Sequence, residues 1–398
     1  MSTMQLLTAP AQSPTGANAN PGAELSSGRL LCLDVFRGLL VAGMILVDNG
    51  DDKSYWAIKH AEWNGWTPAD FIFPSFLFLV GVSLVFSYSA RMQRGESRAQ
   101  ILWHAFKRSL LLIAIGLFVN GFPFIGVDCH GFRFEGVTQR IALCYFAAAI
   151  LVLWSNRRGQ IIAIAACLLG YWAILRFLPV PGFGMPGRDI PFMDQNGNIA
   201  AWLDRKLFMG HLYNGNRDPE GIIHTIPAIA TALIGVLTGG WLRSGRDRGT
   251  IAIRMALVGI LGLAAGEVWN VWFPINKNLW TSSFVLFAGG FSLVFLALLY
   301  WILEIKQWRG AWTMPLLVFG MNAIAGFVAD SFVYGPGYSW SVKGANGAAV
   351  LLHDAAQARL DVLIADPANA ALIFAVASVL FCWCLLWLFW RKRIFLKV

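Results

Sequence analysis

Long apolar stretches constrain the fold of this chain more than any other feature of its sequence. A helix needs about 20 predominantly apolar residues to cross the roughly 30 Å of hydrocarbon in a bilayer. Such stretches lie at 30–49, 70–90, 108–126, 137–154, 160–178, 222–242, 251–273, 279–304, 312–333 and 370–390. They predict an all-α, polytopic transmembrane bundle of about ten helices.

The composition supports a membrane-embedded chain without a separate soluble domain. Charged residues make up 13% of the 398 residues, where a soluble chain has about 25%. The 18 Trp and 29 Phe fit lipid-facing surfaces and interfacial belts. Residues 1–28 are rich in small and polar residues and contain no Lys or Arg, unlike a signal peptide. We therefore expect a disordered cytoplasmic tail at 1–28 and one transmembrane domain at 29–398.

The net charge of +9 is distributed in a way that indicates membrane orientation, and nucleic acid is not an expected partner. Every even-numbered span is followed by basic residues, and cytoplasmic loops are enriched in Lys and Arg. The pattern places both termini in the cytoplasm and the protein in the cell inner membrane. The basic residues are Arg91, Arg94, Arg98, Lys107 and Arg108, then Arg157 and Arg158, then Arg243, Arg246, Arg248 and Arg254, then Lys306 and Arg309, and finally Arg391, Lys392, Arg393 and Lys397.

The predicted external connections are longer and chemically more varied than the cytoplasmic ones, which favours a site near the external face. One of them is the segment 55–70, which contains Tyr55, three Trp, His60 and Asp70. An imidazole near its ordinary pKa suits a general base for an amine or hydroxyl nucleophile. The alternative is a solvated loop histidine held by Glu62. Asp218 and Glu220 precede another span, where they suit either helix capping or catalysis.

Ionisable and polar groups inside the predicted spans are functional candidates because burying them in lipid is costly. Asp34 and Arg37 lie three residues apart on one helix face, either as a substrate contact or as an internal ion pair. Arg140 follows Gln139 and suits either an anion or carbonyls of neighbouring helices. Asn322 fits a hydrogen bond between helices.

Several classes of site are absent from the sequence. It contains no His, Cys, Asp and Glu cluster with the spacing of metal ligands, so we expect no metal. It also contains no phosphate loop, no G-x-S-x-G elbow and no dinucleotide fingerprint in a strand–helix context. The six Cys lie mostly within apolar segments, which argues against structural disulfides.

Five stretches together resemble the heparan-α-glucosaminide N-acetyltransferase family and its bacterial relatives. In order and spacing they cover most of residues 29–333. They are Arg29–Gly38, then Asn49 through Lys59-His60-Ala61-Glu62-Trp63-Asn64-Gly65 to Asp70 and Pro74, then Gly136–Leu143 with Gln139-Arg140, then Asp218–Gly221 with Thr225–Thr231, and Pro274–Ser283 with Trp280.

The resemblance implies transfer of an acetyl group from acetyl-CoA, the co-substrate, to an amino sugar of the glucosamine type. It also implies a catalytic pair, His60 and Asn49, which are eleven positions apart. His60 would take the amine proton, and Asn49 would orient the substrate or stabilise the oxyanion. The expected contacts to substrate or acyl-CoA are Asp34, Arg37, Asp70, Lys107, Arg108, Gln139, Arg140, Trp280 and Asn322.

Two mechanisms and a second function stay open at this point. Acetyl transfer could be direct or could pass through acetyl-His60. The intramembrane Asp34, Arg37 and Arg140 also fit an amino-sugar transporter of the inner membrane. Membrane lipid is an expected partner, and the sequence is compatible with a homodimer.

Overall fold

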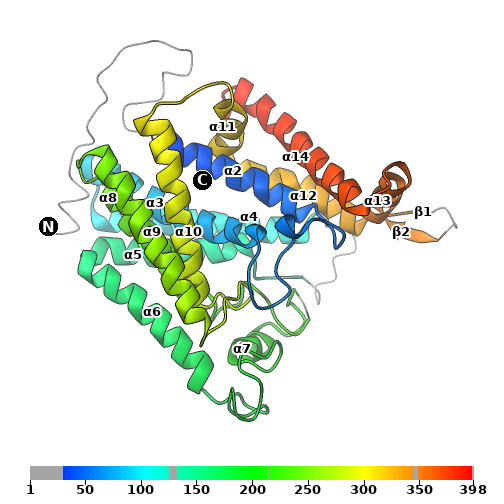
Figure 1. Cartoon of the computed structure of the whole chain (residues 1–398), viewed down its shortest axis with the longest axis horizontal. Helices are drawn as coiled ribbons and strands as arrows, with labels where there is room; N and C mark the ends of the chain where they lie inside the picture. Colours follow the sequence, from blue (N-terminus) through cyan, green and yellow to red (C-terminus); the bar gives the residue numbers. More distant parts are fainter. Residues whose placement is uncertain (1–29, 125–131, 214, 344–347, 397–398) are drawn as a thin grey trace.

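The computed structural model describes residues 30–124, 132–213, 215–343 and 348–396, and it shows an almost entirely helical protein (Figure 1). The predicted disordered tail lies outside the described residues. The long helices are α2 (Leu31–Asp48), α3 (Ile72–Gln93), α4 (Arg98–Gly121), α5 (Val137–Trp154), α6 (Arg157–Phe177), α8 (Thr225–Leu242), α9 (Arg248–Asn270), α10 (Ser282–Tyr300), α12 (Ala323–Ser339) and α14 (Pro367–Arg391).

Shorter elements join these helices. The short helical turns are η1 (Trp56–Ile58), η2 (Pro68–Phe71) and η3 (Trp301–Ile305). The short helices are α7 (Ile199–Leu207), α11 (Thr313–Met321) and α13 (Leu352–Leu363). The antiparallel strands β1 (Ser341–Lys343) and β2 (Ala349–Leu351) pair with Val342 opposite Val350. The sequence did not predict α7, α13 or the two strands.

The prediction of an all-α polytopic bundle is confirmed. Within the described ranges, eight helices are long and apolar enough to cross a membrane, and the bent pair α11–α12 could supply a ninth. The helix α2 is not among the eight, although it is as long as α5, because it carries three ionisable residues in 18, namely Asp34, Arg37 and Asp48. These ten segments correspond to the ten predicted spans.

The ninth predicted span is broken at Asn322, which the continuous prediction for 312–333 missed. The axes of α11 and α12 differ by 89°, and Asn322 has the non-helical dihedral angles φ −127° and ψ 42°. Its side-chain amide donates to the carbonyl of Ile394 at 3.3 Å and accepts from the N–H of Leu396 at 3.1 Å. The side chain thus binds the C-terminal segment, and asparagine is a residue type that competes with helical hydrogen bonding in this way.

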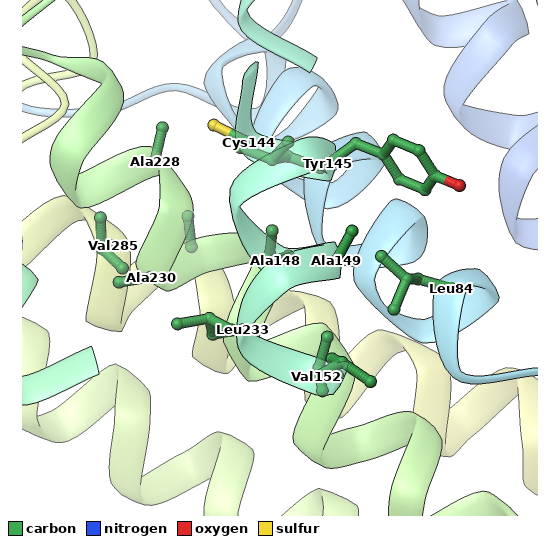
Figure 2. Close-up of a cluster of buried hydrophobic side chains, with 14 of the residues drawn as sticks. Leu84, Cys144, Tyr145, Ala148, Ala149, Val152, Ala228, Ala230, Leu233 and Val285 are labelled. Atoms are coloured by element: carbon green, nitrogen blue, oxygen red, sulfur yellow. The ribbon is translucent and has the colours of Figure 1, made fainter. Parts of the chain in front are cut away.

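The core of the bundle is built on small residues that let helices approach closely. Figure 2 shows Ala148 of α5 on the side of Leu233 and Ala228 of α8, and Ala149 on the side of Leu84 of α3, with Val285 of α10 beyond α8. These side chains are all fully or almost fully buried. Close approach of this kind is the usual source of helix association in membranes, where lipid gives no hydrophobic drive between helices.

The cluster in Figure 2 joins α3, α8 and α10, and a second buried cluster joins α2 to α3 and α10. Together they position the candidate site. The C-terminal end of α2 and the N-terminal ends of α3, α8 and α10 lie at one end of the bundle, as the contacts described below show. The helices α12 and α14 pack beside α2, and α13 packs against α12 and α14 (Figure 1). The connections 50–67, 179–224 and 271–281 therefore meet at one face.

Candidate active site

His60 lies in the connection between α2 and α3, which two contacts to the C-terminal part of the chain hold in place. Lys53 pairs with Asp361 of α13 at 2.6 Å, and Tyr55 donates a hydrogen bond to Asn369 of α14 at 2.7 Å. The His60 side chain is 43% exposed. The connection thus presents an imidazole that is both anchored and open to solvent.

The buried carboxylate of Asp70 orients the His60 ring. Proline at the first position of η2 and a reciprocal cap between Thr67 and Asp70 explain why this short helix begins here. Asp70 Oδ2 accepts from the backbone N–H groups of Thr67, at 2.9 Å, and Ala61, at 3.1 Å. Asp70 Oδ1 lies 2.8 Å from His60 Nδ1. When Nδ1 carries the proton, Nε2 is left as the base.

Lys277 completes this group, and the sequence did not identify it as a site residue. Its Nζ lies 3.0 Å from both ring nitrogens of His60 and 3.7 Å from Asp70 Oδ1. Burial lowers the pKa of Lys277, while the nearby carboxylate of Asp70 acts in the opposite direction. We call His60, Asp70 and Lys277 the His60 cluster. Lys277 is separated from His60 by 217 positions. In the sequence, the signal that could have identified it as a site residue is its place in Pro274–Ser283, the last of the five stretches that carry the family resemblance.

Asn49, the predicted partner of His60, is buried at the C-terminal end of α2. Its side-chain Nδ2 donates to the carbonyl of Ile45 at 2.9 Å and to Asp330 Oδ1 of α12 at 2.7 Å. The neighbouring Asp48 interacts electrostatically with His60 and Lys277. The structure therefore brings the end of α2 to the His60 cluster, while both amide hydrogens of Asn49 bind other groups of the protein.

A second polar group lies at the same end of the bundle but is closed to solvent. We call Glu135, Arg140, Asp204 and His224 the internal cluster, and the exposed fraction of each residue is 7% or less. Arg140 Nη2 donates to the carbonyls of Pro219, at 2.7 Å, and Gly221, at 3.4 Å. Among the described residues, Arg140 Nε and Nη1, Asp204 Oδ2, Glu135 Oε2 and both His224 ring nitrogens have no hydrogen-bond partner.

Burial dominates the electrostatics of the internal cluster. It raises the pKa of Glu135 to about 9 and that of Asp204 to about 7, and it lowers the pKa of His224 to about 3. In each case the neutral form is favoured because the charged form loses its hydration. Beside the cluster, burial also raises the pKa of Asp218, but hydrogen bonds from Arg133 outweigh it and lower the pKa overall.

The other predicted contact residues do not converge on one point. Gln139, Arg140 and Trp280 lie at the His60 end, where the Arg140 guanidinium stacks over the Trp280 ring at 5.0 Å. Arg37 lies near the start of α2 and pairs with Asp34 at 3.1 Å. On α4, Arg108 stacks on Tyr145 at 4.9 Å and Lys107 lies over Trp103 at 5.9 Å. Asn322 binds the C-terminal segment.

The part of the chain that the structure describes contains no group of three or more His, Cys, Asp or Glu that could hold a metal ion. The chemistry of the His60 cluster is instead that of proton transfer and charge stabilisation. A half-exposed imidazole, a buried carboxylate and an ammonium group within hydrogen-bonding reach are suited to removing a proton from an incoming nucleophile.

Comparison with known proteins gives two results that agree on a family. The family model for the catalytic part of heparan-α-glucosaminide N-acetyltransferase matches residues 29–265, which include Asn49, His60 and Asp70. Heparan-α-glucosaminide N-acetyltransferases from Mus musculus and Homo sapiens are each 34% identical to this chain over 368 residues. Each alignment covers 79% of this chain and 55% of the relative, so the chain spans about half the length of these relatives.

Proposed function

Because the chain belongs to the heparan-α-glucosaminide N-acetyltransferase catalytic family, we propose that it is an integral-membrane N-acetyltransferase. It transfers the acetyl group of acetyl-CoA to the amino group of a glucosamine-type sugar. The observation that carries the proposal is the His60 cluster, in which Asp70 orients a solvent-accessible imidazole beside a partly buried ammonium group. The geometry matches what an amine acceptor needs, since the amine must lose a proton during attack on the thioester.

In this proposal His60 is the general base, and Asp70 keeps the ring in the required tautomer. The bond of 2.8 Å between Asp70 Oδ1 and His60 Nδ1 supports that assignment, because a proton on Nδ1 leaves the lone pair on Nε2. Asn49 orients the acceptor at the end of α2. The bonds of its Nδ2 to Ile45 and Asp330 fix the side chain and leave its carbonyl oxygen as the group to receive the substrate.

The acyl-CoA contacts remain those predicted from the sequence, now divided between two ends of the bundle. Arg37, with its partner Asp34, and the α4 pair Lys107 and Arg108 are the proposed contacts for the phosphates of the donor. Gln139, Arg140 and Trp280 are candidates nearer the acetyl group. Because acetyl-CoA is cytoplasmic and His60 lies at the opposite end, the donor must extend through much of the bilayer.

The proposed location is the cell inner membrane, with both termini in the cytoplasm and the His60 cluster on the external side. The basic connections after α3, α5, α8 and α10 support this orientation. Membrane lipid is the surrounding partner, and a homodimer is compatible with the proposal. Cysteine labelling around residue 95 and around residue 200 should give opposite accessibility, and labelling of both from one side would contradict the orientation.

The decisive experiment is acetyl transfer by the purified protein in detergent. Acetyl-CoA is supplied with and without glucosamine, and the acetylated sugar is detected by mass spectrometry. We expect formation of N-acetylglucosamine that depends on the protein and on both substrates. Uptake of glucosamine into proteoliposomes without any acetylated product would instead identify the amino-sugar transporter that the intramembrane charges also fit.

A further inference from the structure

We propose that Lys277 is a catalytic residue whose ammonium group stabilises the negative charge on the acetyl carbonyl oxygen during transfer. This inference rests on the proposed acetyltransferase function and names a further residue of the same site. Acyl transfer from a thioester passes through a tetrahedral intermediate with a full negative charge on oxygen. Donors held in place for that oxygen are often the largest single contribution to catalysis.

The position of the Lys277 ammonium group beside the His60 ring suits it to this role. Nζ lies 3.0 Å from both Nδ1 and Nε2 of His60, whereas Asp70 contacts Nδ1 alone. An acceptor amine that gives its proton to Nε2 must bring the reacting carbonyl to the same side of the ring. The Lys277 side chain is 19% exposed, so its charge acts in a poorly hydrated environment where electrostatic interactions are stronger than in water.

The connection carrying Lys277 is also held in one conformation. The carbonyl of Ile275 accepts from the N–H of Gly65 at 2.8 Å. Asn276 Nδ2 donates to Asn64 Oδ1 at 3.1 Å. Both bonds join the Lys277 connection to the His60 connection, so the two reacting groups keep a fixed relation to each other.

Trp280 adds a third constraint on the same connection. Its φ is 49°, a left-handed conformation that is a genuine outlier for a bulky residue and persists only where the surroundings enforce it. The indole is fully buried, donates to Thr231 Oγ1 at 3.2 Å and lies under the guanidinium of Arg140. Strain of this kind clusters at functional sites. The internal cluster therefore supports the backbone that carries Lys277.

The titratable groups that face Lys277 come from four different segments. They are Asp48 at the end of α2, His60, Asp70 of η2, and Glu220 before α8. Burial lowers the pKa of Lys277, while these three carboxylates favour the charged form. The result is an ammonium group whose proton can be lost at a pH below that of an ordinary lysine.

The neutral acceptor amine attacks the thioester carbon, and the carbonyl π electrons move to oxygen, where the Lys277 ammonium stabilises them. The amine proton passes to His60 Nε2. The carbonyl then re-forms, the carbon–sulfur bond breaks, and the proton on His60 passes to the CoA thiolate. The same oxyanion forms if His60 itself attacks first. Both amide hydrogens of Asn49 are already bound, so Asn49 does not supply this donor.

The test compares Lys277→Met and Lys277→Arg with Lys59→Met as the matched control. Lys59 lies on the His60 connection, and within the described ranges its side chain hydrogen-bonds to the backbone carbonyl of Asp52. Removal of one oxyanion donor typically costs about 10²- to 10³-fold in kcat. We expect Lys277→Met to lose kcat in that range with an unchanged KM for acetyl-CoA, and Lys59→Met to match the wild type.

The pH profile separates a catalytic charge from a structural contact. Stabilisation of the oxyanion requires a protonated Lys277, so activity should be present below its pKa and lost above it. Lys277→Arg keeps the charge to a much higher pH, so its alkaline limb should move to higher pH or disappear, even if kcat is reduced. A purely structural side chain would leave that limb unchanged.

Two results would overturn the assignment. One is a folded Lys277→Met protein with wild-type kcat, and the other is a Lys277→Arg protein whose alkaline limb coincides with that of the wild type. Size-exclusion profiles and thermal unfolding establish folding in each case. Failure of the wild-type protein to acetylate any amino sugar would count against the proposed function itself and is recognised before the variants are measured.

Discussion

The His60 cluster and the internal cluster lie at the same end of the bundle, yet their ionisable groups differ in solvent exposure and in hydrogen bonding. In the first, the imidazole is 43% exposed and all three members contact one another. In the second, every member is buried, and Asp204, Arg140 and His224 retain atoms without a hydrogen-bond partner in the described part of the chain. Access to solvent thus distinguishes a group placed for a reactant from a group placed to support a neighbouring loop.

The largest effect on the rate of acetyl transfer is expected when His60 is replaced. Removal of a general base typically costs about 10²- to 10⁴-fold in rate. We expect His60→Ala to lose at least about 100-fold in acetyl transfer while acyl-CoA binding is retained. Asn49→Ala should be impaired as well, because it frees Asp330 and loosens the end of α2. Near-wild-type turnover by a well-folded His60→Ala protein would remove His60 from the mechanism.

The pH dependence of the protein's stability should reveal whether the buried carboxyl of Asp204 is protonated in the internal cluster. The pKa of Asp204 is raised to about 7, so the stability linked to its protonated form is complete below about pH 4 and is lost as the pH rises through 7. Between pH 5 and pH 7 the ionisation equilibrium of this carboxyl alone should lower the free energy of unfolding by about 2 kcal/mol. Thermal unfolding in detergent across that range measures it.

Asp204→Asn is the control for this measurement, since the amide oxygen can still accept the N–H of Ile222. The variant should show a flatter dependence of its unfolding temperature on pH. Equal slopes for the wild type and the variant would mean that Asp204 is ionised throughout and that the two clusters are less different than their burial indicates.

The smallest effect is expected for Arg140→Lys. Lysine keeps the charge but loses the planar fork that binds Pro219 and stacks on Trp280. We expect a loss of stability of about 1 kcal/mol and only a small loss of acyl-CoA affinity, because protein groups already engage the Arg140 guanidinium. Arg37→Lys is the matched variant, for which the loss of acyl-CoA affinity should be larger. Equal losses of acyl-CoA affinity in the two variants would contradict this difference.

The transmembrane helices were predictable because hydrophobicity is a local signal. The predicted span 137–154 coincides with α5, and 279–304 differs from α10 with η3 by three residues at its start and one at its end. The start of α4 at Arg98 was predicted ten residues late, because its first turns are polar and contain His104, Lys107 and Arg108. The break at Asn322 was missed because its cause lies 72 and 74 residues away, in the C-terminal segment.

The candidate site was predictable only in part for the same physical reason. His60 and Asp70 lie on neighbouring segments, so the aromatic connection drew attention to both. Lys277 and Asp330 reach the site through tertiary contacts that no local pattern records. Arg140 was identified as a buried charge, but the carbonyls and the indole that it binds could be seen only in the folded chain.

The separation of His60 and Lys277 along the chain also means that the two residues are synthesised at different times. Ribosomes add about 5–20 residues per second, so the 217 positions between these residues take on the order of 10–40 s to synthesise. Asp330, which binds Asn49, is made later still. The segment that carries His60 is therefore made well before Lys277, and the proposed site can form only after Asp330 has been added.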